Sequence, residues 1–165
     1  MCTRVDNTGD SVMGMKILKI YIENSVVGGY FDEEFQEHTR KLFNDFRSNK
    51  HTPIISSHVI AELENGAPEY IKENLKSLNY EEIVVNEEMI KLAEKYLEEK
   101  IVSKKYYGDA LHIAVATVKN VDVLVSWNFK HIVNLDKIRL FNSVNLREGY
   151  RVLEIRTPRE VIESE

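Results

Sequence analysis

The chain has 165 residues, of which 43% are hydrophobic and 30% charged, as expected for one globular domain with a sizeable core. Its net charge of −5 provides no basic field to attract nucleic acid over a distance, although a bound metal ion can supply positive charge locally. No apolar run approaches the roughly 18 residues that cross a membrane. The one cysteine, Cys2, excludes an internal disulfide and fits a reducing, cytoplasmic compartment.

The first 14 residues are polar and show no periodicity of apolar residues. They also lack the apolar stretch of a secretory signal. We expect them to form a flexible segment ahead of one domain that spans residues 15–165.

The first regular element is expected at residues 16–22, whose sequence KILKIYI is almost continuously apolar. Such a short run of branched and aromatic residues predicts a strand that is buried on both faces. Further strands are predicted at 52–56, 82–85, 121–125 and 151–155. Helices are predicted at 30–49, from Ser57 to a stop at Asn65, and at 68–77, 87–101, 109–118, 137–148 and from Pro158. This alternation predicts an α/β fold, a three-layer α/β/α sandwich around a parallel sheet.

Four polar residues stand at the ends of apolar elements. Glu23 follows the first strand, Glu62 lies in the helix after the second strand, Asp109 opens a nearly all-apolar helix, and Asn128 follows the fourth strand. Because parallel strands end at one edge of a sheet, these side chains can approach one another there. Oxygen ligands of this kind suit Mg²⁺ or Mn²⁺, which can activate water for attack on a phosphodiester.

Each of the four residues also has an ordinary structural explanation. Asp109 could favour the dipole of a first helical turn, Glu62 could be solvated, and Glu23 could be a loop carboxylate. Asn128 could be a turn residue or a helix cap.

The histidines and glycines give weaker signals. His58 stands four residues before Glu62, and His112 three residues after Asp109, so either pair could bind a metal, although satisfied or solvated histidines are more common. Gly28–Gly29 alone is weak evidence for phosphate binding. The motifs of zinc proteases, serine hydrolases and nucleotide-binding loops are absent.

Four segments together resemble the PIN domain family, in the family's order and over about residues 15–162. They are IYIENSVVGGYFD, SSHVIAELENG, YGDALHIAVAT and VDVLVSWNFKHIVN. The resemblance implies a metal-dependent ribonuclease fold with a five-stranded parallel sheet. Many stand-alone members are toxins of VapC type, which act on RNA, pair with a small antitoxin and are usually homodimeric.

Positions carried over from the family give a candidate site. Glu23, Glu62 and Asp109 would hold Mg²⁺ or Mn²⁺, and Asn128 would complete the shell through its carbonyl or a water. Ser25 and Ser126 would support the ligands by donating hydrogen bonds. Independently of the family, we expect Lys130 or His131 to meet the RNA backbone.

Two departures from the family pattern matter. The first acidic residue is Glu23 rather than Asp, one methylene longer, and Asn128 brings no charge. With three carboxylates, the site is therefore expected to hold one metal ion firmly rather than two. An endoribonuclease is the leading hypothesis, and the alternative is a catalytically weak PIN-like module that binds RNA or a protein. A small-molecule hydrolase has no dedicated motif to support it.

Overall fold

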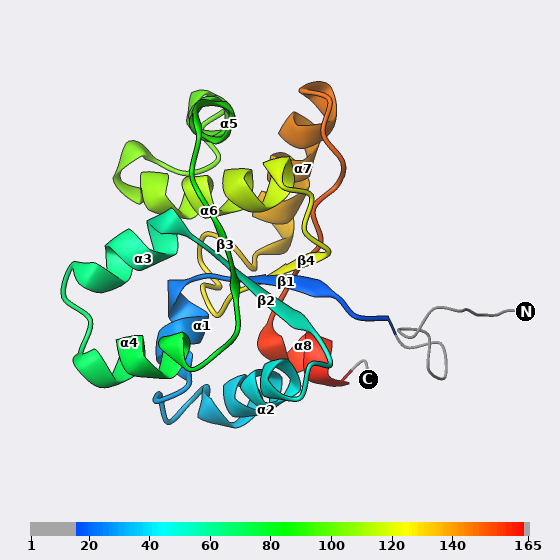
Figure 1. Ribbon diagram of the computed structural model, residues 1–165. Coiled ribbons are helices and arrows are strands. Elements are labelled where there is room, and N and C mark those ends of the chain that lie inside the picture. The colour runs from blue at the N-terminus through cyan, green and yellow to red at the C-terminus, as the bar shows by residue number, and fades with distance from the viewer. Residues whose placement is uncertain (1–15, 164–165) are drawn as a thin grey trace, which may run out of the picture.

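Five parallel strands form the centre of the molecule, in a computed structural model that describes residues 16–163 (Figure 1). The strands run in the order β3-β2-β1-β4-β5, and every neighbouring pair is parallel. Their bounds are β1 (Lys19–Ile22), β2 (Thr52–Ser56), β3 (Glu81–Ile83), β4 (Val123–Val125) and β5 (Ile155–Arg156).

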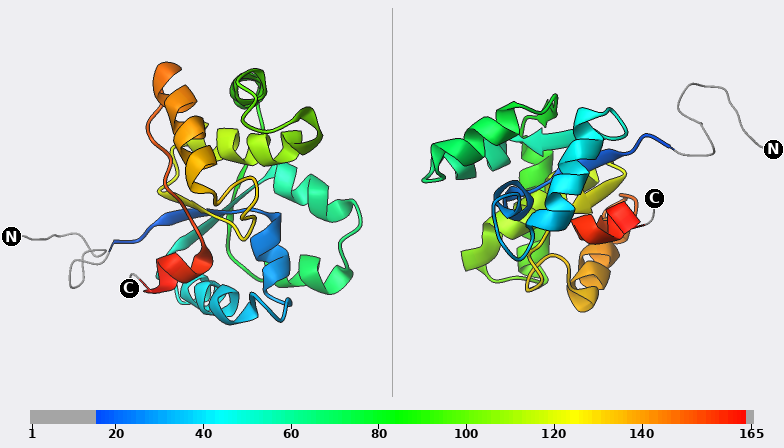
Figure 2. Two further views of the ribbon diagram at one scale, coloured as in Figure 1. Left: turned by 180° about the vertical axis from the view of Figure 1, so that it is seen from behind. Right: turned by 90° about the horizontal axis from the view of Figure 1, so that it is seen from below.

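Helices cover both faces of the sheet. They are α1 (Asn24–Gly29), α2 (Gln36–Arg47), α3 (Ser57–Glu64), α4 (Glu69–Lys76), α5 (Glu87–Glu98), α6 (Tyr107–Val118), α7 (Leu135–Arg147) and α8 (Pro158–Glu163). Helices α5, α6 and α7 lie on one side, and α1, α2 and α8 lie on the other (Figures 1 and 2). The predicted three-layer α/β/α sandwich with a five-stranded parallel sheet is confirmed.

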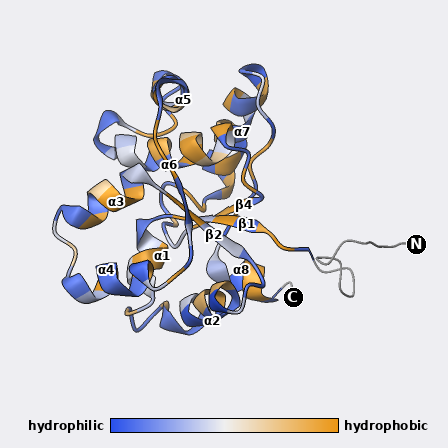
Figure 3. Cartoon of the chain, viewed as in Figure 1, coloured by the Kyte–Doolittle hydropathy of each residue, from blue (hydrophilic) through white to orange (hydrophobic). Residues whose placement is uncertain are grey.

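The core is built on β1, whose residues Ile20, Tyr21 and Ile22 are all inaccessible to solvent. The central strands are coloured as mainly hydrophobic in Figure 3, whereas the outer helices alternate between polar and apolar residues. Helix α6 is the exception among the helices, because Ala110–Thr117 are all buried. The prediction of a buried first strand and a buried helix near residue 109 is therefore confirmed.

Several local predictions were wrong. Helix α1 and a short 3₁₀ turn at Lys104–Tyr106 were not expected. Helix α6 begins at Tyr107, two residues before the predicted start at 109, so Gly108 lies within it. Helix α3 does begin at Ser57 as predicted, and the hydroxyl of Ser56 caps it by accepting the N–H of Val59 at 3.2 Å.

The segment 1–14 lies outside the described residues. No helix among residues 16–163 combines the length and the apolar character needed to cross a membrane.

Gly29 in α1 allows a close approach between this helix and Trp127. A Cβ at position 29 would lie 3.0 Å from Trp127 Cδ1 and 3.1 Å from Thr39 Oγ1. The indole is held in place, since its Nε1–H donates to Thr39 Oγ1 at 2.9 Å and its ring stacks on Phe35. Gly29 therefore has a packing function, and nothing in its surroundings requires phosphate binding.

We predict that Gly29→Ala lowers the free energy of unfolding by about 1–3 kcal/mol, because the methyl group must displace a packed indole. Gly28→Ala is the matched control, since no atom lies within 4 Å of its Cβ position. This control should be neutral or stabilising by up to about 1 kcal/mol in a helix. Urea unfolding of both variants checks the prediction, and equal stabilities would show that Trp127 moves aside freely.

Candidate metal centre at the carboxyl end of the sheet

The candidate site lies where β1 and β4 end side by side. Ile22 pairs with Val125 in the parallel register, so Glu23 and Ser126 follow at the same edge. Strand β1 leads to β2 on one side and pairs with β4 on the other, which makes this edge a point where the strand order reverses. Ligands bind at such points in open parallel sheets.

Glu23 is buried and held by its neighbours. Its side chain caps α1, accepting the Ser25 N–H at 3.0 Å and the Ser25 hydroxyl, and the residue is only 4% exposed. Burial raises the pKa of Glu23 above 4.5, although the charge of His112 and hydrogen bonds from Ser25 and Ser126 oppose that rise. The two serines predicted to support the site thus lie beside Glu23, 3.4 Å apart through their hydroxyls.

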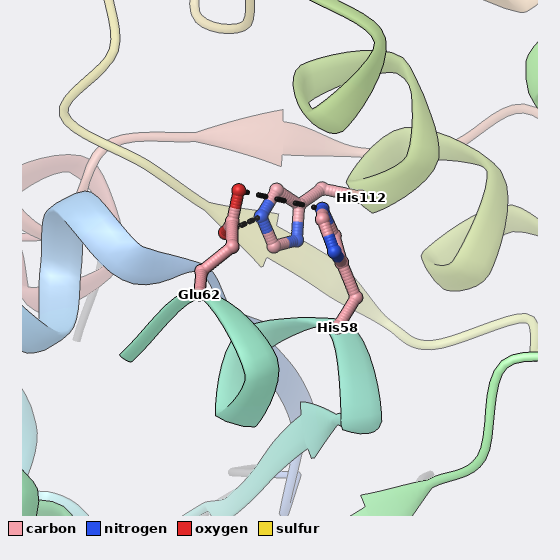
Figure 4. A group of neighbouring side chains, drawn as sticks. All are labelled: His58, Glu62 and His112. Atoms are coloured by element: carbon pink, nitrogen blue, oxygen red, sulfur yellow. Dashed lines mark hydrogen bonds and ion pairs between the residues drawn. The ribbon is translucent and has the colours of Figure 1, made fainter. Parts of the chain in front are cut away.

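Glu62, on α3, is an exposed residue whose carboxylate faces two adjacent imidazoles (Figure 4). Its Oε1 is 2.9 Å from His112 Nε2, and its Oε2 is 3.5 Å from His58 Nε2. Partial burial acts to raise the pKa of Glu62, but the hydrogen bond and charge of His112, with the charge of His58, leave it below its usual value. The pKa of His58 is lowered, first by burial and then by His112.

Asp109 lies in the first turn of α6 and accepts a hydrogen bond from His131 Nδ1 at 3.0 Å. The residue before it, Gly108, leaves room for α3 to approach. A Cβ there would lie 3.1 Å from Glu62 Oε2 and 3.4 Å from His58 Nε2. The absence of a side chain at position 108 therefore brings Glu62 close to the start of α6, where Asp109 stands.

Asn128 occupies the turn after β4. Its side-chain oxygen accepts the backbone N–H groups of Lys130 at 3.2 Å and His131 at 3.0 Å. This is the turn role considered from the sequence, and it uses both lone pairs of the oxygen. A direct bond from this oxygen to a cation would require the side chain to give up part of that turn.

The two residues expected to meet RNA differ in exposure. Lys130 is exposed, and its Nζ lies 5.7 Å from the centre of the Tyr106 ring. His131 is 8% exposed, bonded to Asp109 and packed on Tyr106 at 3.9 Å between ring centres. His131 therefore orients Asp109.

The sequence did not predict the hydroxyl network of Tyr21 or the partners of His112 and His131. The Tyr21 hydroxyl lies 2.8 Å from both Ser56 Oγ and His112 Nδ1, and burial raises its pKa, helped by the charges of Glu23 and Glu62. The three-residue spacing suggested that Asp109 pairs with His112. Instead, His112 and His58 both contact Glu62. Asp109 accepts a hydrogen bond from His131. These partners are far apart in the sequence, so only the three-dimensional structure identifies them.

The carboxylates suit a divalent cation. Glu23 and Glu62 both act on His112, and Glu62 lies next to the turn that carries Asp109. The three carboxylates are thus linked through the two histidines, although their oxygens do not all lie within 4.8 Å of one another. A buried carboxylate with a raised pKa, as at Glu23, is a group whose ionised form a cation would stabilise.

No protein-family model matches the sequence, and no curated protein matches it significantly. Two solved structures are similar in fold. The crystal structure of VapBC2 from Rickettsia felis bound to a DNA fragment from their promoter aligns at a TM-score of 0.52 with 20% identity, over 84% of this chain and 98% of that one. Mycobacterium tuberculosis VapC20, a sarcin-ricin loop cleaving toxin, also aligns at 0.52, with 13% identity over 82% of this chain and 98% of that one.

We predict that Glu23→Gln stabilises the metal-free protein at pH 8. A carboxyl whose pKa is raised by folding favours the folded state below its unfolded pKa, and this contribution is lost as the pH rises through the folded pKa. The glutamine side chain in the variant does not ionise, so the variant does not lose stability in this way as the pH rises. The melting temperature in EDTA should therefore be higher for the variant at pH 8, and the difference should shrink towards pH 4.5, the reference value for this carboxyl.

Glu33→Gln, at an exposed position, serves as the control and should leave the melting temperature unchanged at every pH. Each kcal/mol corresponds to about 2–4 °C for a chain of this size. A less stable Glu23→Gln at pH 8 would mean that hydrogen bonds from Ser25 and Ser126 outweigh the effect of burial.

Proposed function

We propose that this chain, which has the fold of a VapC-like PIN domain, is a metal-dependent endoribonuclease that hydrolyses RNA phosphodiester bonds. The observation that carries the proposal is that the candidate carboxylates are arranged around one pair of histidines: Glu62 contacts His58 and His112, Glu23 acts electrostatically on His112, and Asp109 acts on His58. The two VapC structures of similar fold support it, one being a toxin that cleaves the sarcin-ricin loop.

In this proposal Glu23, Glu62 and Asp109 hold Mg²⁺ or Mn²⁺. Asn128 completes the shell through a water more readily than through its carbonyl, because that oxygen serves the turn. When bound, the cation supplies an activated water and offsets charge on the phosphodiester.

The surrounding side chains position the carboxylates. Ser25 and Ser126 fix Glu23, His112 orients Glu62, and His131 orients Asp109. A set of ligands held in this way needs little rearrangement when its cation arrives. These donors also stabilise the negative charges while the site is metal-free.

RNA binding would depend on local contacts, since the net charge is −5. Lys130 and Lys105 both lie beside Tyr106, at 5.7 and 5.6 Å from its ring centre, near the turn that bears Asn128. We assign Lys130 as a contact to the RNA backbone. With few such contacts, the affinity for RNA should fall only modestly as salt rises.

We further propose that the protein is a toxin of VapC type that acts in the cytoplasm, is paired with a small antitoxin and forms a homodimer. Support comes from the fold of the VapC neighbours and from the family resemblance of the four segments.

The second candidate is a PIN-like module with weak or no catalysis that binds RNA or a protein partner. One observation favours it: the Asn128 side-chain oxygen is fully used by two backbone N–H groups and adds no negative charge to the site. Such a module would bind RNA or a protein partner without cleaving RNA.

We predict that wild-type protein binds Mn²⁺ saturably and cleaves RNA only when the metal is present. Asp109→Asn should lose both properties, with cleavage reduced by about 100-fold or more because a ligand of the cation is removed. Calorimetric Mn²⁺ titration and a gel assay on structured RNA, carried out side by side, check the prediction.

Asp122→Asn is the matched control. This carboxylate stands before β4 at the opposite edge of the sheet, where it accepts the Lys19 N–H at 2.7 Å, and an amide oxygen can still accept that bond. The control should bind Mn²⁺ and cleave as the wild type does. Metal binding without cleavage in the wild type would favour the binding module, and no binding in either protein would refute the metal site.

A further inference from the structure

His58, Glu62 and His112 form a compact group outside the expected set of oxygen ligands (Figure 4). Each offers one ligand atom, and the three atoms lie within 4.8 Å of one another. Among residues 16–163 no other three His, Cys, Asp or Glu side chains meet this condition. We propose that this group is a binding site for a transition-metal ion that favours nitrogen ligands, such as Zn²⁺ or Co²⁺.

The distances fit a small cation. Ligands around a tetrahedral metal at 2.0–2.1 Å stand about 3.3 Å apart. Here Glu62 lies 2.9 Å from His112 Nε2 through one oxygen and 3.5 Å from His58 Nε2 through the other. Two histidines and one glutamate also form a known set of protein ligands for zinc, with a fourth position open to water.

The ligand types select against Mg²⁺. Imidazole nitrogen suits zinc, cobalt, nickel and copper, whereas Mg²⁺ requires oxygen ligands in near-octahedral geometry. The two imidazoles lie close together, with ring centres 4.4 Å apart. Since Glu62 belongs to both ligand sets, a transition metal on the histidines would compete with Mg²⁺ or Mn²⁺ for this carboxylate.

His112 has the support that metal-binding histidines usually have. Its Nδ1 lies 2.8 Å from the Tyr21 hydroxyl, which in turn lies 2.8 Å from Ser56 Oγ. Both hydroxyls can donate or accept, so they can stabilise either tautomer of the imidazole. With a metal on Nε2, Nδ1–H donates to Tyr21, and Tyr21 donates to Ser56. Such a partner on the second ring nitrogen orients the ligand.

The site is accessible and carries compensating charge. The side chains of Glu62 and His58 are 38% and 15% exposed, so an ion can enter from that side. Glu23 acts electrostatically on His112, and Asp109 on His58. In the absence of a metal, His112 Nε2–H donates to Glu62 and His58 Nε2–H can donate to the Gly108 carbonyl at 3.1 Å. A metal would replace these two protons.

Cobalt absorption tests the site without relying on RNA cleavage, so it is independent of the proposed function. CoCl₂ is titrated into the EDTA-treated and dialysed full-length protein, and the visible band of four-coordinate Co²⁺ is followed. We expect saturation at one equivalent and displacement of the band by Zn²⁺. His58→Ala should weaken Co²⁺ binding by at least about tenfold, and Tyr21→Phe by about tenfold.

His38→Ala is the matched control, because this histidine lies on α2 beside Glu163 and away from the group. It should bind Co²⁺ like the wild type. Asp109→Asn should keep the band even though it loses Mn²⁺-dependent cleavage. Melting temperatures in EDTA, and their increase on adding Zn²⁺, confirm that each variant is folded and report binding by a second route.

The outcomes separate this site from the proposed nuclease. A cobalt band that depends on His58, in a protein that cleaves no RNA, would support the histidine site while the nuclease proposal fails. A wild type without a band, or without a Zn²⁺-induced rise in melting temperature, would overturn the histidine site. A band lost in Asp109→Asn but kept in His58→Ala would also overturn it, since Co²⁺ would then occupy the carboxylates.

Discussion

The parallel pairing of β1 with β4 is the constraint on which the rest of the structure depends. It places Glu23 and Ser126 at one edge of the sheet, and it brings the Ser25 hydroxyl within 2.8 Å of the Trp127 N–H. A shift of the register by one residue would move these polar groups apart. The hydrophobic core and the polar site are therefore fixed by the same backbone contacts.

Hydrogen-bond donors stabilise each of the three candidate carboxylates. Each one has its own donor: Ser25 for Glu23, His112 for Glu62 and His131 for Asp109. Without these partners, the loss of hydration of a buried carboxylate would oppose folding. The donors come from α1, α6 and the turn after β4, so the site requires both faces of the sheet to be in place.

The parallel sheet could be predicted from the sequence, since the central strands β1 and β4 carry short apolar runs and helical segments separate the strands. Helix α1 could not be predicted, because NSVVGG is short and ends in two glycines, and it depends on the cap from Glu23. Tyr21 looked like one more buried aromatic residue, and its hydroxyl network involves residues 35 and 91 positions away. The contacts of His112 with Glu62 and of His131 with Asp109 were missed for the same reason, because they join residues far apart in the sequence.

The separation of the paired groups along the chain has a consequence for synthesis. The hydrogen bonds that join α1 to the end of β4 link residues 101 and 102 positions apart. A nascent chain on the ribosome cannot assemble this edge until β4 and its following turn have left the exit tunnel. A protein that we propose to cleave RNA would thus remain without its complete site while most of its own message is being translated.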